Sequence, residues 1–368
     1  MRWDGARGKF GNVPSRGAHD PTWHCRYRPP RRRRQIHRRP GPGGEGAVSE
    51  AARKKVLAAA GALRYRPNTA ARALRRGDNR LLGVVIPNAS SRGILSATLQ
   101  AQKLEGLAHG AKRLGYDLQI FIEDLSDPFA LQRLACEKQV RGFFFLGSVQ
   151  RPTLEFLKRY RIPWMGVNWR HKETPDDPHC WTDFPHAGRT LADHLVRLGC
   201  RRVVAFDWLS IEYGPFGRGI REVWELYGLP KQDLALHVGS EYAHGPKVVE
   251  ALEAAFDAPA RPDGLILGHQ AGAMEAYRIL RARGLRIGAD FAVASFDDLD
   301  AARNMDPPCT AFAQPAFGMG EACVEEMDRL LEGRAKSPIE RNIPGELRVR
   351  ESSAHFKPAG ANAEARTS

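Results

Sequence analysis

A basic segment near the amino-terminal end, residues 65–74 (Tyr-Arg-Pro-Asn-Thr-Ala-Ala-Arg-Ala-Leu), carries side chains that could recognise DNA. On a short helix, Arg72, Arg75 and Arg76 would accompany the apolar side chain of Leu74. Arginine reads the width and negative potential of a minor groove, and an apolar side chain can be wedged into a base step. The segment is therefore either a helix that binds the minor groove or a solvated basic linker between domains.

The elements on either side of this segment would position it. A helix is expected from Val48 to Leu63, because Ser49 can cap it and apolar residues follow at helical spacing. Pro67 ends that helix, and Asn68 can cap the next one. The apolar run at 81–86 then indicates the first buried strand of a large α/β domain.

The net charge of +14 is unevenly distributed along the 368 residues. Residues 1–47 hold 12 Lys/Arg against 3 Asp/Glu, and residues 48–80 hold 9 against 2, which leaves 35 against 37 for residues 81–368. A nearly neutral body with a basic N-terminal end is typical of a nucleic-acid-binding appendage on a globular sensor or enzyme.

Composition favours a cytoplasmic protein. No apolar run reaches the ~20 residues of a membrane span, and the first thirty residues lack the apolar stretch of a signal peptide. The six cysteines are scattered without a CxxC pair, so reduced thiols are expected rather than disulfides or zinc. We expect no metal and no cofactor.

The body shows alternating strand and helix patterns. Strand-like runs lie at 81–86, 118–122, 141–146, 162–168, 202–206, 264–267 and 291–296, and amphipathic helices at about 96–114, 127–138, 187–198, 246–256, 271–283 and 315–332. This pattern predicts an α/β fold with parallel sheets covered on both faces, in which ligands bind beyond the carboxyl ends of the strands. The stretch is too long for one such unit, so two lobes with a cleft between them are expected.

Several motifs in order resemble the lactose-repressor (LacI) family of bacterial transcription regulators. They are Val48–Arg53 with Tyr65–Asn68, Gly83–Pro87, His194–Val203, Val293–Asp298, Asp306–Thr310 and Gln314-Pro315. Each motif is weak alone, but their order and spacing from Val48 to about Ser352 are specific. The resemblance implies a periplasmic-binding-protein-like body with two doubly wound parallel sheets, in agreement with the strand count.

The resemblance also implies that the basic segment is an operator-binding hinge helix. Leu74 is similar to the leucine that family dimers wedge into the central step of a palindromic operator; simple packing is the other role open to it. The DNA-binding residues expected from the family are Tyr65, Asn68, Ala71, Arg72, Leu74 and Arg75. A homodimer on double-stranded DNA is the expected assembly.

The resemblance implies a small-molecule effector between the lobes, and a sugar-like molecule is expected; sugars and purines are typical ligands of the family. Asp297 matches the family's ligand-binding aspartate, and the further effector-binding residues that we expect are Asp183, Arg218, His269 and Gln314. Asp183 is open to a second interpretation as a helix cap. The family's effector-binding arginine is replaced by Phe216 and its Asn-Asp pair by His269-Gln270, so the usual ligand preferences do not carry over.

The expected domains follow from these motifs. Residues 1–47 form a basic, disordered segment, interpreted either as out-of-frame translation of a GC-rich coding region in place of a helix-turn-helix or as a genuine basic tail. Residues 48–80 resemble the third headpiece helix and the hinge. The two-lobed body spans 81–356, with lobe 1 at about 81–199 and 314–342 and lobe 2 at about 200–313 and 343–356, before a tail at 357–368.

Two function classes remain after this inspection. The first is a ligand-responsive transcription regulator, and the alternative is a soluble sensor that has lost sequence-specific DNA binding. An enzyme is not expected, because the sequence has no P-loop, Gly-x-Ser-x-Gly, HExxH or strand-linked GxGxxG motif.

Overall fold

The computed structural model describes residues 54, 59, 80–87, 98–123, 129–137, 140–169, 176–207, 214–239, 242, 245–335 and 339–357. All of them belong to one compact unit, residues 48–368. The basic segment at 1–47 and every residue expected to bind DNA lie outside the described residues. The structure therefore does not test the predictions of a basic tail and a DNA-binding hinge helix.

The first sheet has six strands in the order β2-β1-β3-β4-β5-β11, and every pair is parallel. Its strands are β1 (Leu81–Pro87), β2 (Asp117–Glu123), β3 (Phe143–Phe145), β4 (Trp164–Val167), β5 (His179–Thr182) and β11 (Glu340–Ile343). The strand order reverses between β1 and β3, which makes their carboxyl ends a topological switch point.

The second sheet repeats this topology as β7-β6-β8-β9-β10-β12, with only β12 antiparallel to its neighbour. Its strands are β6 (Val203–Asp207), β7 (Leu234–Val238), β8 (Gly264–Leu267), β9 (Ala292–Phe296), β10 (Thr310–Ala313) and β12 (Glu346–Arg348). The switch point here lies between β6 and β8.

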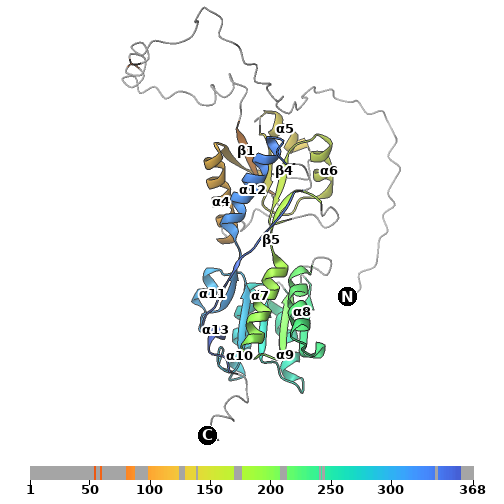
Figure 1. Cartoon of the computed structure of the whole chain (residues 1–368), viewed down its shortest axis with the longest axis vertical. Coiled ribbons are helices and arrows are strands. Elements are labelled where there is room, and N and C mark those ends of the chain that lie inside the picture. Colours follow the sequence, from red (N-terminus) through yellow and green to blue (C-terminus); the bar gives the residue numbers. More distant parts are fainter. Residues whose placement is uncertain are drawn as a thin grey trace, which may run out of the picture. The chain divides into compact units, whose positions relative to one another are not determined.

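Helices cover both faces of each sheet (Figure 1). The first sheet is covered by α4 (Thr98–Leu114), α5 (Phe129–Glu137), α6 (Arg151–Arg159) and α12 (Ala316–Leu331). The second is covered by α7 (Phe184–Arg197), α8 (Pro215–Leu226), α9 (Gly245–Asp257) and α10 (Gln270–Ala282). The short elements η1 (Lys231–Asp233), α11 (Asp300–Asn304) and α13 (Glu351–Ala354) complete the described structure.

The two-faced burial explains the apolar strand runs. In β1, Leu82, Val84 and Ile86 pack into the core under α4 and α12, while Val85 packs into the core under α5 and α6. Both faces of a parallel sheet are buried, so the strand reads as continuously apolar rather than alternating. The prediction of two doubly wound parallel sheets is confirmed.

One predicted lobe boundary differs from the structure. The sequence placed residues up to 199 in the first lobe, whereas α7 packs against α8 and the second sheet. The chain therefore changes sheets directly after β5, at residue 183, because the apolar face of α7 (Leu191, Leu195) fits the second core. It returns between β10 and α12 and crosses once more between β11 and β12.

Each sheet has one pair of helices in close backbone contact. A Cβ on Gly106 of α4 would lie 2.0 Å from the Phe317 carbonyl oxygen, and a Cβ on Gly320 of α12 would lie 2.3 Å from the Lys103 carbonyl oxygen. The α7–α8 pair repeats this device with Gly188 and Gly219. Only glycine allows the backbones to approach this closely, so these four positions fix both helix crossings.

Among the described residues, no helix is long and apolar enough to cross a membrane.

Candidate functional site

Asp297 lies at the carboxyl end of β9, where the sequence placed a ligand-binding carboxylate. Its backbone takes a left-handed conformation with φ of 75°, and its amide donates a hydrogen bond to the Phe312 carbonyl oxygen at 3.1 Å. The side chain is buried, and burial raises its pKa from the usual 3.8 to about 6, although the hydrogen bond from Gln314 and the charge of Lys103 act in the opposite direction. A carboxylate in this setting can accept hydrogen bonds from ligand hydroxyl groups.

Gln314 joins the carboxyl edges of the two sheets. Its Nε2 donates to Asp297 Oδ1, at the end of β9 in the second sheet. Its Oε1 accepts from Asn168 Nδ2 at 2.9 Å and from the Thr182 hydroxyl at 3.0 Å, at the ends of β4 and β5 in the first sheet. Asn168 in turn accepts from the Thr182 amide at 2.9 Å. The Gln314 side chain therefore forms hydrogen bonds with residues of both lobes, at the crossover where the chain enters α12.

Lys103 of α4 approaches this network from the first lobe. It is 4% exposed and lies close enough to Asp297 for the carboxylate charge to interact with its ammonium group. Burial lowers its pKa from 10.5 to about 8, even though Asp297 acts to raise it. The carbonyl of Lys103 touches Gly320, so the close α4–α12 crossing holds this lysine beneath the carboxyl edge.

Aromatic side chains form an apolar floor beside Asp297. The Phe296 ring lies 5.4 Å from Phe184, 5.5 Å from Phe216 and 5.9 Å from Phe312, measured between centroids. Trp181 extends this cluster, with its ring 4.9 Å from Phe184. The four phenylalanines belong to the buried core of the second lobe, so they place a region of low polarity next to Asp297.

Two glutamines near the carboxyl edges have buried polar atoms without a hydrogen-bond partner. Gln270, at the start of α10 and 3% exposed, has neither its Oε1 nor its Nε2 paired. Gln100, one turn before Lys103 on α4, has an unpaired Oε1. Buried polar groups are nearly always satisfied by protein, water or ligand, so such groups indicate where a ligand completes the hydrogen bonding.

The remaining predicted effector residues have separate environments. Asp183 caps α7, with Oδ1 accepting from the His186 amide at 2.8 Å, as the second interpretation foresaw. Arg218 is exposed on the first turn of α8, where its Nε lies 3.7 Å from Glu222 Oε1. His269 is partly buried directly after β8 and before Gln270. Asp297 and Gln314 are thus the predicted pair that the structure joins by a hydrogen bond.

The position of the missing arginine, Phe216, is 2% exposed and packs on Phe296. The Phe216 ring packs in the core of the second lobe. At this position the chain therefore has a buried aromatic side chain instead of the family's charged arginine. Asp207, at the end of β6, accepts a hydrogen bond from the Gly217 amide at 2.8 Å and holds the start of α8 against this edge.

Five functional candidates were missed by the sequence reading: Asn168, Thr182, Lys103, Gln100 and Gln270. A polar residue directly after a buried strand is the signal for Asn168, whose φ of 55° also suits asparagine. Lys103 begins the buried stripe Lys103, Gly106, Leu107, Gly110 and Ala111 at helical spacing, so a charge inside an apolar stripe was the available signal.

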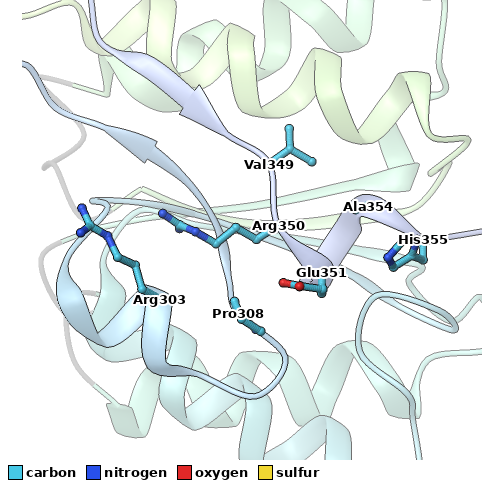
Figure 2. A pocket seen from close by; sticks show the side chains of 7 residues that line it. All are labelled: Arg303, Pro308, Val349, Arg350, Glu351, Ala354 and His355. Carbon is cyan, nitrogen blue, oxygen red and sulfur yellow. The ribbon is translucent and has the colours of Figure 1, made fainter.

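A shallow pocket of about 510 Å³ lies elsewhere on the second lobe (Figure 2). Arg303 and Arg350 line it together with Glu351 and His355. Both arginines, with Arg348, surround the carboxylate of Asp298 at 2.7–3.4 Å. Their charge is engaged in this structural ion-pair cluster, so the pocket is a poorer candidate than the edge around Asp297.

The site around Asp297 offers hydrogen-bond acceptors, donors and one buried cation over an aromatic floor. This arrangement suits binding of a small polar ligand. Within the described part of the chain, no group of three or more His, Cys, Asp or Glu side chains could hold a metal ion.

Comparisons with known proteins agree with the fold. A family model described as the periplasmic binding protein-like domain matches residues 192–353. The ribose operon repressor of Escherichia coli (strain K12) is 26% identical over 292 residues, which cover 76% of this chain and 83% of that protein.

Two solved structures share the architecture. The Lac repressor dimer bound to operator and the anti-inducer ONPF has a TM-score of 0.66 and 19% identity, covering 84% of this chain and 92% of its own. The transcriptional regulator CelR in complex with cellobiose has a TM-score of 0.61 and 21% identity, covering 84% of this chain and 93% of its own. At these identities the likeness to the two structures concerns the fold.

Proposed function

We propose that the chain is a regulator of the lactose-repressor (LacI) family and that it binds operator DNA with an affinity set by a small-molecule effector. The observation that carries this proposal is the hydrogen-bond bridge of Gln314, which links Asn168 and Thr182 of one sheet to Asp297 of the other. A ligand that binds at Asp297 competes for this bridge and thereby changes the relation of the lobes.

The effector site that we propose is the carboxyl edge around Asp297 and Gln314, with His269 beside it and Asp183 and Arg218 at its rim. Side-chain hydrogen-bond acceptors and donors gathered at one edge are what a polyhydroxylated ring requires. A sugar-like ligand is supported by the relative named for the ribose operon and by the CelR complex with cellobiose.

The DNA-binding part of the proposal rests on the sequence. Leu74 would enter the central step of a palindromic operator, while Tyr65, Asn68, Ala71, Arg72 and Arg75 would contact the groove or backbone. Two copies of the hinge are needed for a palindrome, so the working form would be a homodimer, like the Lac repressor dimer on its operator. Effector binding would change operator affinity through a coupling free energy between two separate sites.

The proposal is tested with the full chain and a duplex selected from a randomised library. Fluorescence anisotropy at ~150 mM salt should show tighter binding to the selected palindrome than to a scrambled duplex, because phosphate contacts alone are weak at this salt concentration. Leu74→Ala should lower the palindrome affinity strongly and leave effector binding unchanged. Leu226→Ala, which truncates a leucine that is 80% exposed on α8, is the matched control.

Equal affinity for the selected and scrambled duplexes would contradict operator recognition. That outcome, with effector binding retained, would instead support the alternative of a sensor that has lost sequence-specific DNA binding.

A further inference from the structure

A buried lysine, Lys103, lies at the proposed effector site and forms no direct ion pair with any described residue. Lys103 is 4% exposed and has no hydrogen bond or ion pair with another residue described here, although Asp297 is near enough to interact through its charge. The Asp297 Oδ1 atom is already engaged by Gln314. Burial removes the ammonium group from water at a cost that the attraction of Asp297 only partly offsets, so the protein keeps Lys103 in place at the expense of stability.

The surroundings of Lys103 favour an anion. Lys103 lies in the first two turns of α4, which has no acidic residue in its first turn. Amide groups at the start of a helix point their hydrogens outward and favour negative charge, in addition to the charge of the lysine. Since α4 follows β1, this end of the helix lies at the carboxyl edge of the first sheet, where ligands bind in this fold.

The unpaired glutamines define what the rest of the ligand must supply. Gln100 lies three residues before Lys103 on the same helix face, and its buried Oε1 requires a donor. Gln270 follows β8, the neighbour of β9 and Asp297, and its amide requires both a donor and an acceptor. Hydroxyl groups can both donate and accept, so they meet both requirements. A bare inorganic anion has no carbon skeleton with hydroxyl groups that could reach residues of both lobes.

We propose that the effector is an anionic sugar derivative whose carboxylate or phosphate pairs with Lys103 and whose hydroxyl groups bind Gln100, Gln270 and Asp297. This inference rests on the proposed effector site and specifies its ligand class. Lys103 sets the charge of the ligand, and Asp297 beside it accepts hydrogen bonds from the ligand hydroxyl groups.

The test compares acids with their neutral parents. Isothermal titration calorimetry of the full chain at pH 7 would use galacturonate against galactose, gluconate and glucuronate against glucose, and glucose 6-phosphate as the phosphate arm. At least one acid should bind about 10- to 100-fold more tightly than its neutral parent, the factor expected for a hydrogen bond to a charged group.

Three variants assign the effect to the lysine. Lys103→Met, of similar length, should remove the preference for the acid, and Lys103→Arg should retain part of it. Lys112→Met, an exposed lysine on the same helix, should behave as the parent protein. Thermal unfolding of each variant checks that the fold is intact.

An acid affinity that Lys103→Met leaves unchanged would overturn the proposal. The proposal would also be overturned if the neutral sugars bound and none of the acids did. Failure of every compound in the panel to bind would overturn it as well. The operator titration is independent of Lys103, so failure of the ligand class and failure of the regulatory function are distinguishable.

Discussion

The α4–α12 pair and the α7–α8 pair are both held in close contact by glycines, but they bury different side chains at the carboxyl edges of their sheets. In each pair, two glycines let the helix backbones touch: Gly106 and Gly320 in the first, Gly188 and Gly219 in the second. The second pair buries phenylalanines at the carboxyl edge of its sheet, Phe184 and Phe216. The first pair buries a lysine at the corresponding edge.

This difference shows which pair is built for stability and which for binding. Aromatic burial in the second pair contributes favourable transfer free energy. Lys103 in the first pair opposes folding, since burial outweighs the attraction of Asp297 and lowers the pKa of the lysine. A destabilising group that a rigid crossing holds in place is typical of a functional site.

The largest expected effect tests the feature that the pairs share. Gly219→Ala and Gly320→Ala should each lower the free energy of unfolding by about 3 kcal/mol, because the new Cβ would lie 2.1 Å and 2.3 Å from a carbonyl oxygen of the partner helix. Chemical denaturation measures this loss. Gly318→Ala on α12, where a Cβ meets nothing within 4 Å, should instead stabilise by about 0.5 kcal/mol. Equal behaviour of the two α12 variants would exclude the close crossing.

The next largest effect tests the feature that distinguishes the α4–α12 pair from the α7–α8 pair, the buried Lys103. Lys103→Met should raise the free energy of unfolding at pH 7 by about 3 kcal/mol, the equivalent of a pKa lowered from 10.5 to about 8. A depressed lysine pKa destabilises the fold below pH 8 and has no effect above pH 10.5, so the gain should vanish at high pH. Denaturation at pH 7 and pH 10.5, with Lys112→Met as the control, measures it. A variant less stable than the parent at pH 7 would contradict this account.

Asp297 should give a stability change confined to a narrower pH range. Its folded pKa of about 6 lies above the usual 3.8, so the folded state binds more protons and the free energy of unfolding falls as pH rises through this window. The total change is about 3 kcal/mol, of which about 2 kcal/mol falls between pH 4 and 6. Asp297→Asn should flatten this part of the stability profile, and an unchanged slope would exclude Asp297 as its source.

The smallest effect concerns the exposed ion pairs at the solvent side of each helix pair, a feature that both pairs share. Arg113 pairs with Glu325 at 2.7 Å across α4–α12, and Arg189 pairs with Glu222 at 2.8 Å across α7–α8. All four side chains are at least 37% exposed, so Arg113→Gln and Arg189→Gln should each cost under about 0.5 kcal/mol. Denaturation in low and high salt should show the cost disappearing as charges are screened. A loss above 1 kcal/mol in either variant would show that these ion pairs also differ.

Much of the fold could be predicted because its signals are local. The seven apolar runs and six helical patterns each coincide with an observed element, with ends shifted by a few residues. The predicted ranges did not include strands β5, β7, β10, β11 and β12 or helices α6 and α8. The missed strands have only three to five residues, and all except β7 begin or end with a polar residue. Asp297 could be placed at the site because a carboxylate directly after a buried strand must lie at the sheet edge.

The amino-acid sequence by itself determined the alternation of strands and helices, the two-lobed parallel architecture and the position of Asp297 at a strand end. Only the tertiary structure decided that Gln314 bridges to Asn168, 146 residues away, and that Lys103 is buried beside Asp297. Periodicity reports which face of an element is covered, because it depends on neighbours along one chain segment. Which charge meets which partner depends on how separate segments cross, and here the glycine contacts of α4 and α12 decide it.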